Sequence, residues 1–170
     1  MAQGLDWLNS LSHEEAEAEL LKCCGSTAWA CAVAARRPFA EEEQLLSAAD
    51  DVWSNLEADD WLEAFSRHPK IGERKSPTAQ SAQEQSWSRH EQSRAGGTDE
   101  SERALLAELN REYERKFGHI FIVCAAGKGT AEILASLKSR IGNDAAAEVK
   151  NAAEEQRQIT RLRLRKLLEA

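Results

Sequence analysis

The chain has 170 residues, of which 42% are apolar and 30% are charged, with only three prolines and nine glycines. This composition is typical of one globular, largely helical domain and excludes disordered, collagen-like and low-complexity chains. Acidic side chains outnumber basic ones by 29 to 22, and the resulting net charge of -7 disfavours a nucleic-acid partner. The apolar runs are too short to span a bilayer, so we expect a soluble protein without membrane contact.

The N-terminus and the cysteines bear on the compartment. The first residues contain no basic region followed by an apolar one, so we expect no secretory signal. The four cysteines form no C-x-x-C pair, and Cys31 and Cys124 lie in apolar stretches. We therefore expect reduced thiols, mostly in the core, and favour them over a disulfide framework.

Four helices are predicted in the first half of the chain. Ser12 and Glu15 match the capping box, in which each side chain satisfies a free amide at a helix start. Ser26 can cap a second helix, which should run through Arg36 because Pro38 disfavours helical geometry in Arg37 before it. The predicted helices cover residues 13–24, 26–36, 40–56 and 59–65.

Four more helices are predicted after a loop over residues 70–77. The first of them is almost entirely polar, so burial can contribute little to its stability. Its residues nevertheless have adequate helix propensity. The next is strongly amphipathic and ends at Gly118, while Thr130 and Asn143 can cap the last two. The predicted helices cover residues 78–94, 98–117, 130–140 and 143–168.

Residues 119–124 form the single β-rich run of the sequence. One isolated strand has no obvious partner, so we expect buried extended chain between helices. The whole pattern predicts an all-α, single-domain bundle of about eight helices over residues 1–170, without internal repeats.

Polar side chains on the predicted helix 78–94 are the first candidates for chemistry. Ser88, Glu91 and Gln92 are spaced i, i+3 and i+4, so they share one helix face and could bind a small polar ligand. His68 lies at a helix end beside Pro69, where an imidazole can be rigid yet reachable. From residue types alone, a solvated helix and a structural histidine remain the stronger interpretation.

Several other kinds of site are disfavoured by spacing. His68, His90, Glu91 and His119 offer no H-E-x-x-H or H-x-x-x-H pair, so we predict no metal site among them. The stretch 127–130 lacks the first glycine and spacing of a phosphate-binding loop, and no G-x-S-x-G elbow is present.

Arg163 stands apart from the other basic residues near the C-terminus. It lies between Leu162 and Leu164, four residues after Ile159, close to the apolar stripe of its helix. A guanidinium there needs a carboxylate or a ligand oxygen, so Arg163 can face either the solvent or a pocket.

Four motifs in register then carry a resemblance that covers nearly the whole chain. They are WLEAFSRHPKIG (61–72), WSRHEQS (87–93), NREYERKFGHIFIVCA (110–125) and ITRLRL (159–164). In order and spacing they resemble the OHCU decarboxylase family, which acts on 2-oxo-4-hydroxy-4-carboxy-5-ureidoimidazoline between urate and (S)-allantoin. Residues 23–26 and 60–66 are most similar to the decarboxylase domain of plant-type allantoin synthases.

The resemblance implies roles for individual residues. His68 and Glu91 match the family's catalytic pair, and the other matched positions line the substrate site. Those substrate-binding positions are Pro69, Ser88, Gln92, Phe121, Ile122, Val123 and Arg163. Two positions depart from the family pattern, because Lys128 stands where arginine is usual and His119 where phenylalanine is usual.

The chemistry that the resemblance implies needs no cofactor. Loss of CO2 leaves a carbanion beside a ring carbonyl, so the substrate itself can hold the electrons while the enzyme positions and protonates it. We expect His68, oriented by Glu91, to move protons, and Arg163 and the amides near Ile122 to hold ring oxygens.

Other readings of the sequence remain open. A noncatalytic helical module that binds a ligand or protein would also suit the acidic surface, and a metal-dependent ureide hydrolase is a further alternative. The resemblance also implies a possible homodimer and a fusion or partnership with a hydroxyisourate hydrolase. Relatives in eukaryotes are often peroxisomal, but the ending 168–170 is not a peroxisomal tripeptide, so peroxisome and cytoplasm both remain possible.

Overall fold

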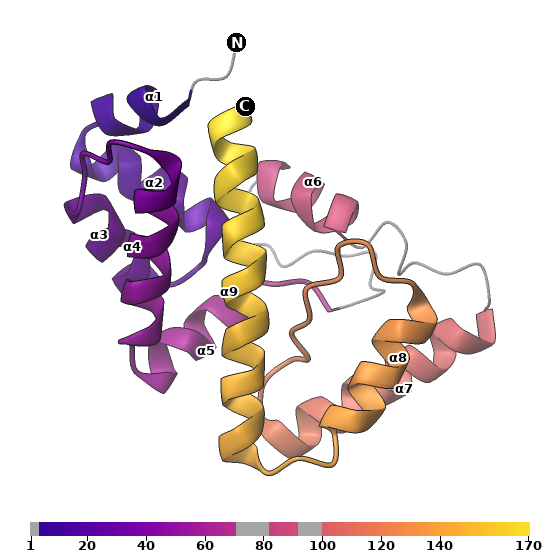
Figure 1. Ribbon diagram of the computed structural model, residues 1–170. Helices are drawn as coiled ribbons and strands as arrows, with labels where there is room; N and C mark the ends of the chain where they lie inside the picture. Colours follow the sequence, from indigo (N-terminus) through magenta and orange to yellow (C-terminus); the bar gives the residue numbers. More distant parts are fainter. Residues whose placement is uncertain (1–3, 71–81, 92–99) are drawn as a thin grey trace. The chain divides into compact units, whose positions relative to one another are not determined.

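The computed structural model describes residues 4–70, 82–91 and 100–170, and within these ranges every regular element is an α-helix (Figure 1). The all-α prediction is therefore confirmed. The helices are α1 (Gly4–Ser10), α2 (His13–Cys23), α3 (Thr27–Ala35), α4 (Glu42–Ser54), α5 (Ala58–Ser66), α6 (Ala82–Glu91), α7 (Glu100–Phe117), α8 (Thr130–Arg140) and α9 (Ala145–Glu169).

The chain divides into two compact units. The first contains the residues up to Ala64 and Arg157–Ala170, and the second contains Phe65–Gln156. The unit boundaries fall inside α5 and α9, so each of these two helices contributes residues to both units.

The first unit is built around apolar side chains of α2, α3 and α4, with α2 packed on α3 and α3 on α4. Leu20, Leu45 and Leu46 are fully buried, as is Trp29, whose indole N–H donates to the Ala49 carbonyl oxygen at 3.1 Å. Burying a side chain of this size removes its apolar surface from water, which supplies most of the stabilisation of such a helix group.

The second unit has its apolar core between α7, α8 and the segment that joins them. Gly118 ends α7 with a φ of 78°, a backbone conformation that glycine adopts without strain. Residues 121–125 are buried and form neither helix nor strand, which confirms a buried connection between helices for residues 121–124 of the predicted segment. The core residues are Leu106, Tyr113, Phe121, Val123, Ala125, Ile133, Leu134 and Leu137.

The predicted start of α2 is confirmed by its capping box. The Glu15 amide donates to Ser12 Oγ at 3.2 Å, and the Ser12 amide donates to Glu15 Oε2 at 2.9 Å. The cysteine prediction also holds, because all four thiols are free and Cys31 alone among them is exposed.

Three local predictions were wrong. Helix α1 was not predicted; a two-turn helix has little stability of its own, and burial of Leu8 accounts for it. Asn143 does not cap α9, because its amide donates to Glu148 Oε2 at 3.1 Å, while Asp144 accepts from the Ala147 amide at 2.7 Å. Thr130 is the first residue of α8 and Gly129 precedes it as the cap.

The other helix bounds agree with the predictions to within a few residues. For the polar helix, the described part is Ala82–Glu91, and the remainder of the predicted range lies outside the described residues. Within the described part of the chain, no helix combines the length and apolarity that crossing a bilayer requires.

Candidate functional site

His68 is positioned just beyond the end of α5 in the second unit. Its backbone amide donates to the Phe65 carbonyl oxygen at 3.2 Å, and the following Pro69 is buried. The ring is half-buried, and its Nε2 lies 2.6 Å from Oε1 of Gln156 on α9. A short hydrogen bond to a fully buried amide restrains the imidazole in one orientation.

Gln156 is a site residue that the sequence analysis missed. It follows Ala152 and Ala153 at helical spacing and is as fully buried as they are, so it is a polar side chain within an apolar stripe. That interruption is the signal that could have drawn attention to it, because a buried amide needs a hydrogen-bond partner.

Helix α6 turns its polar side chains inward. Glu84, Ser88 and Glu91 are all at most 8% exposed, and their i, i+4 and i+7 spacing places them on one face. The structure therefore brings Ser88 and Glu91 together as predicted and adds Glu84, whose Oε1 lies 3.4 Å from Nη2 of Arg67. Gln92 lies outside the described residues.

The segment 121–125 lies close to the carboxylate of Glu91. Burial raises the pKa of the Cys124 thiol, and the nearby carboxylates of Glu155 and Glu91 raise it further. The Glu91 carboxylate at the end of α6 therefore acts electrostatically on Cys124. The thiol of Cys124 stays protonated there, which makes it a poor nucleophile.

A buried polar network anchors the same segment from the other side. Arg140 on α8 donates through Nη1 to the Ile122 carbonyl oxygen at 2.7 Å, and its guanidinium lies 4.4 Å from the centre of the Phe121 ring. Arg140 also donates through Nε to Glu148 Oε1 at 2.6 Å, and Tyr113 donates to the same oxygen at 2.6 Å. These contacts hold residues 121 and 122 in place without a sheet.

The ionisation of this network follows from its burial and its pairing. Burial would raise the pKa of Glu148, but hydrogen bonds from Arg140, Tyr113 and Asn143 outweigh it and leave that pKa lowered. Burial, together with the hydrogen bond to Glu148, raises the pKa of the Tyr113 hydroxyl. At neutral pH the network is therefore a carboxylate held by a guanidinium and a neutral phenol.

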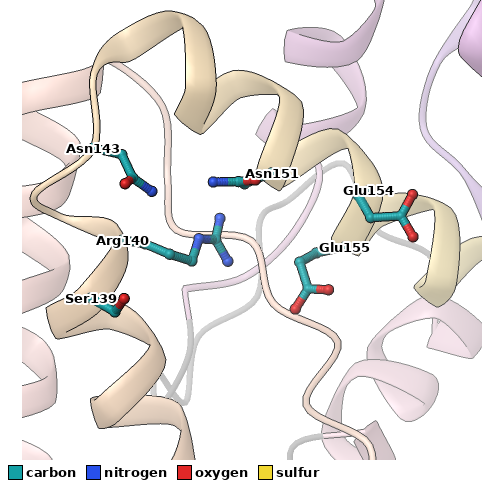
Figure 2. Close-up of a pocket in the computed structure, with 6 residues that line it drawn as sticks. All are labelled: Ser139, Arg140, Asn143, Asn151, Glu154 and Glu155. Carbon is teal, nitrogen blue, oxygen red and sulfur yellow. The ribbon is translucent and has the colours of Figure 1, made fainter.

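An open cavity of about 330 Å³ lies beside this network (Figure 2). In Figure 2 the side chains of Asn143 and Asn151 lie above Arg140, with Glu155 to its right on α9. The lining residues are Ser139, Arg140, Asn143, Asn151, Glu154 and Glu155, and no predicted site residue is among them. Arg140 therefore both lines this cavity and contacts residues 121 and 122.

The two positions that depart from the family pattern have clear surroundings. His119 packs among aromatic rings, with ring centres 5.4 Å from Phe65 and 5.6 Å from Tyr113, so it occupies an aromatic position as the usual phenylalanine would. Lys128 Nζ lies 3.8 Å from Glu155 Oε1 at the other end of the segment.

Arg163 belongs to the first unit and is buried there. It is 3% exposed, and its Nη1 makes a long contact of 3.5 Å with the Lys22 carbonyl oxygen. The positive charge of Arg163 lowers the pKa of the Cys24 thiol. Burial has the larger effect and raises that pKa to about 12. Of the two alternatives that the sequence left open for Arg163, the structure shows the buried one, whereas its contact with substrate stays a prediction.

The second unit thus contains several side chains of types that can exchange protons. It holds a restrained imidazole, a buried carboxylate and hydroxyl on one helix face, and a fixed extended backbone segment. Such groups can position a small polar molecule and transfer protons to or from it.

Comparisons with known proteins agree with this chemistry. A family model described as OHCU decarboxylase matches residues 9–165. The uric acid degradation bifunctional protein TTL of Arabidopsis thaliana is 38% identical over 92% of this chain, which spans about half of that relative, 48% of its length. The 2-oxo-4-hydroxy-4-carboxy-5-ureidoimidazoline decarboxylase of Amia calva is 31% identical over 95% of this chain and 93% of that protein.

Solved structures give the same result. A crystal structure of OHCU decarboxylase in the presence of (S)-allantoin matches with a TM-score of 0.76 and 37% identity, covering 89% of this chain and 98% of that one. A crystal structure of (S)-allantoin synthase shares the fold with a TM-score of 0.70 at 19% identity, covering 97% of this chain and 54% of that one.

Proposed function

Because the chain belongs to the OHCU decarboxylase family, we propose that it decarboxylates 2-oxo-4-hydroxy-4-carboxy-5-ureidoimidazoline to (S)-allantoin during urate degradation. The observation that carries this proposal is the 2.6 Å contact between His68 Nε2 and Gln156 Oε1. It restrains an imidazole in the unit that also buries Glu91, Ser88 and residues 121–123. A restrained proton carrier is what a stereospecific decarboxylase requires.

The proposed reaction uses the substrate as its own electron sink. The bond between the ring and the carboxylate breaks, CO2 leaves, and the electron pair is held as an enolate in the conjugated ring. His68 takes the proton of the substrate hydroxyl and returns one to the ring carbon. Delivery from one side only gives a single enantiomer of allantoin. The reaction takes up one further proton from the solvent, which neutralises the negative charge that the departing CO2 leaves on the ring, and His68 returns to its starting protonation state.

The surrounding residues have positioning roles in this proposal. Gln156 holds the His68 ring, and Glu91 is proposed to orient it for proton transfer. The Ser88 hydroxyl and the backbone amides of residues 121–123 are proposed to donate to ring oxygens, and Pro69, which is buried, to line the substrate site. The roles of Gln92 and Arg163 in substrate binding are predictions from the resemblance.

Stereochemistry tests the proposal better than rate, because the same product also forms spontaneously as a racemate. Urate is converted with urate oxidase and hydroxyisourate hydrolase, with and without this protein, and product chirality is followed by circular dichroism. We expect rapid appearance of one enantiomer with the wild-type chain. His68→Ala is expected to abolish that signal, and His90→Ala, at an exposed position of α6, is the matched control.

Two outcomes would contradict the proposal. Single-handed product from His68→Ala would remove its proton-transfer role, and a racemic product from folded wild-type protein would favour a noncatalytic binding module. Loss of activity with a chelator would instead indicate a metal-dependent hydrolase.

For the positioning role of Gln156, we expect Gln156→Leu to lower kcat more than it raises KM and to shift the acid limb of the pH profile.

We also propose a functional setting for the chain. Relatives named bifunctional uric acid degradation proteins include TTL and the PucL protein of Bacillus subtilis. We propose that this chain works with a hydroxyisourate hydrolase, in the peroxisome or cytoplasm, and that it forms a homodimer. Light scattering tests the dimer, and a single unfolding transition would support residues 1–170 as one domain.

A further inference from the structure

A cluster of three metal-ligating side chains lies on the surface of the first unit. His13 and Glu17 are one turn apart on α2, and Cys31 lies on the neighbouring helix α3. One ligand atom from each residue lies within 4.8 Å of the other two. Among the residues that the structure describes, this is the one group of three or more such side chains close enough to share a metal ion. None of the three residues belongs to the proposed catalytic machinery.

The distances in this cluster fit a tetrahedral zinc ion. His13 Nε2 lies 3.7 Å from Cys31 Sγ and 3.5 Å from Glu17 Oε2. With ordinary bond lengths, a tetrahedral Zn²⁺ separates a nitrogen and a sulfur ligand by about 3.6 Å and a nitrogen and an oxygen ligand by about 3.4 Å. A rotation of the partly exposed Glu17 carboxylate is the main adjustment that the site would need.

The ligand set also selects the metal. A thiolate and an imidazole suit Zn²⁺ and disfavour the hard cations Mg²⁺ and Ca²⁺, which prefer oxygen ligands. The thiolate and carboxylate together balance the charge of the ion. Three protein ligands leave the fourth tetrahedral position to water, which the exposure of the cluster allows.

We propose that His13, Glu17 and Cys31 form a Zn²⁺ site that links α2 to α3. Binding replaces the Cys31 S–H proton and the present His13 contacts by bonds to the ion, so it releases one proton and ties two helices together. The site stabilises the first unit and shields the single exposed thiol among the four cysteines. It is independent of the proposed decarboxylation.

The test is a titration of the reduced, metal-free full chain with Zn²⁺ in the presence of excess Mg²⁺. We expect one equivalent of Zn²⁺ to bind and to raise the unfolding temperature. Cys31→Ser and His13→Ala each weaken binding at least tenfold, and Glu17→Gln weakens it several-fold. Glu14→Gln is the matched control, because it removes a neighbouring exposed carboxylate of α2 and should leave the affinity unchanged.

Two further measurements locate the ion. Co²⁺ in place of Zn²⁺ should give a thiolate-to-cobalt absorption band that Cys31→Ser lacks, and bound Zn²⁺ should protect Cys31 from alkylation by iodoacetamide. Binding below one equivalent would overturn the proposal. Equal affinity of wild type and Cys31→Ser would also overturn it, because the ion would then lie elsewhere.

Discussion

The two units of the molecule bury different chemistry. The first unit has a mainly apolar interior that includes Leu20 and Trp29, with Arg163 as the one buried charge among its described residues, and its ion pairs, such as Arg165 with Glu42, are partly or largely exposed. The second unit buries Glu84, Glu91 and the pair Arg140–Glu148 along with its apolar core. The difference teaches that apolar burial can supply most of the packing of a helix group, whereas several buried charges are kept together where a backbone segment must be fixed.

The largest loss of stability is expected when the centre of the polar network in the second unit is removed. Glu148→Ala leaves the guanidinium of Arg140 buried without its carboxylate and the Tyr113 hydroxyl without its acceptor. We expect the free energy of unfolding to fall by about 3–5 kcal/mol. Urea denaturation measures it, and Glu108→Ala, at an exposed position on α7, should change it by less than about 0.5 kcal/mol.

An apolar truncation is the counterpart in the first unit. Leu20 is fully buried, so Leu20→Ala creates a cavity and should lower the free energy of unfolding by about 2–5 kcal/mol. Leu62→Ala is its control, because Leu62 is 36% exposed and leaves no cavity. The contrast would be refuted if the loss of unfolding free energy in Leu20→Ala depended on pH as strongly as the loss in Glu148→Ala.

Acid should affect the second unit through Glu148. Its pKa in the folded protein is lowered from the ordinary value of 4.5, so its ionised form contributes stability above pH 4.5. That contribution is lost as the pH falls through the lowered pKa of the folded state, because the unfolded chain already binds the proton at higher pH. Urea midpoints measured from neutral pH down to about pH 3 should fall more steeply for wild type than for Glu148→Gln.

The smallest effect is expected from an ion pair of the first unit. Asp50 Oδ2 accepts from Arg161 Nη1 at 2.6 Å and from Arg157 Nη1 at 3.2 Å, in a partly exposed position. Asp50→Asn should cost about 0.2–1 kcal/mol, and the cost should shrink as salt screens the charges. If Asp50→Asn instead lowered the free energy of unfolding by several kcal/mol, independently of salt, this ion pair would behave like the buried polar network and the contrast would fail.

Local signals account for the parts of the fold that were predicted. The Ser12–Glu15 capping box, the end of α7 at Gly118 and the buried run 121–125 each depend on neighbouring residues in the chain. The cap of α9 could not be assigned in this way, since Asn143 and Asp144 are both good caps. Glu148, five residues after Asn143, engages its amide and leaves the cap to Asp144.

The candidate site also combines features that local sequence predicts with contacts that it does not predict. Its residue types could be listed from four motifs, and the helical spacing put Ser88 and Glu91 on one face. The partner of His68 could not be read in this way, because Gln156 lies 88 residues further along the chain. Its only local mark is a polar side chain inside an apolar stripe.

The sequence by itself determined the helical class, most helix ends and the family, because periodicity, caps and motifs are encoded within short stretches. The tertiary structure decided which buried polar groups meet. The Tyr113–Glu148 and Arg140–Ile122 contacts join residues that are far apart in the chain, and their hydrogen bonds form only after the helices have packed. A buried polar group must find a partner, and only the packed chain shows which one it finds.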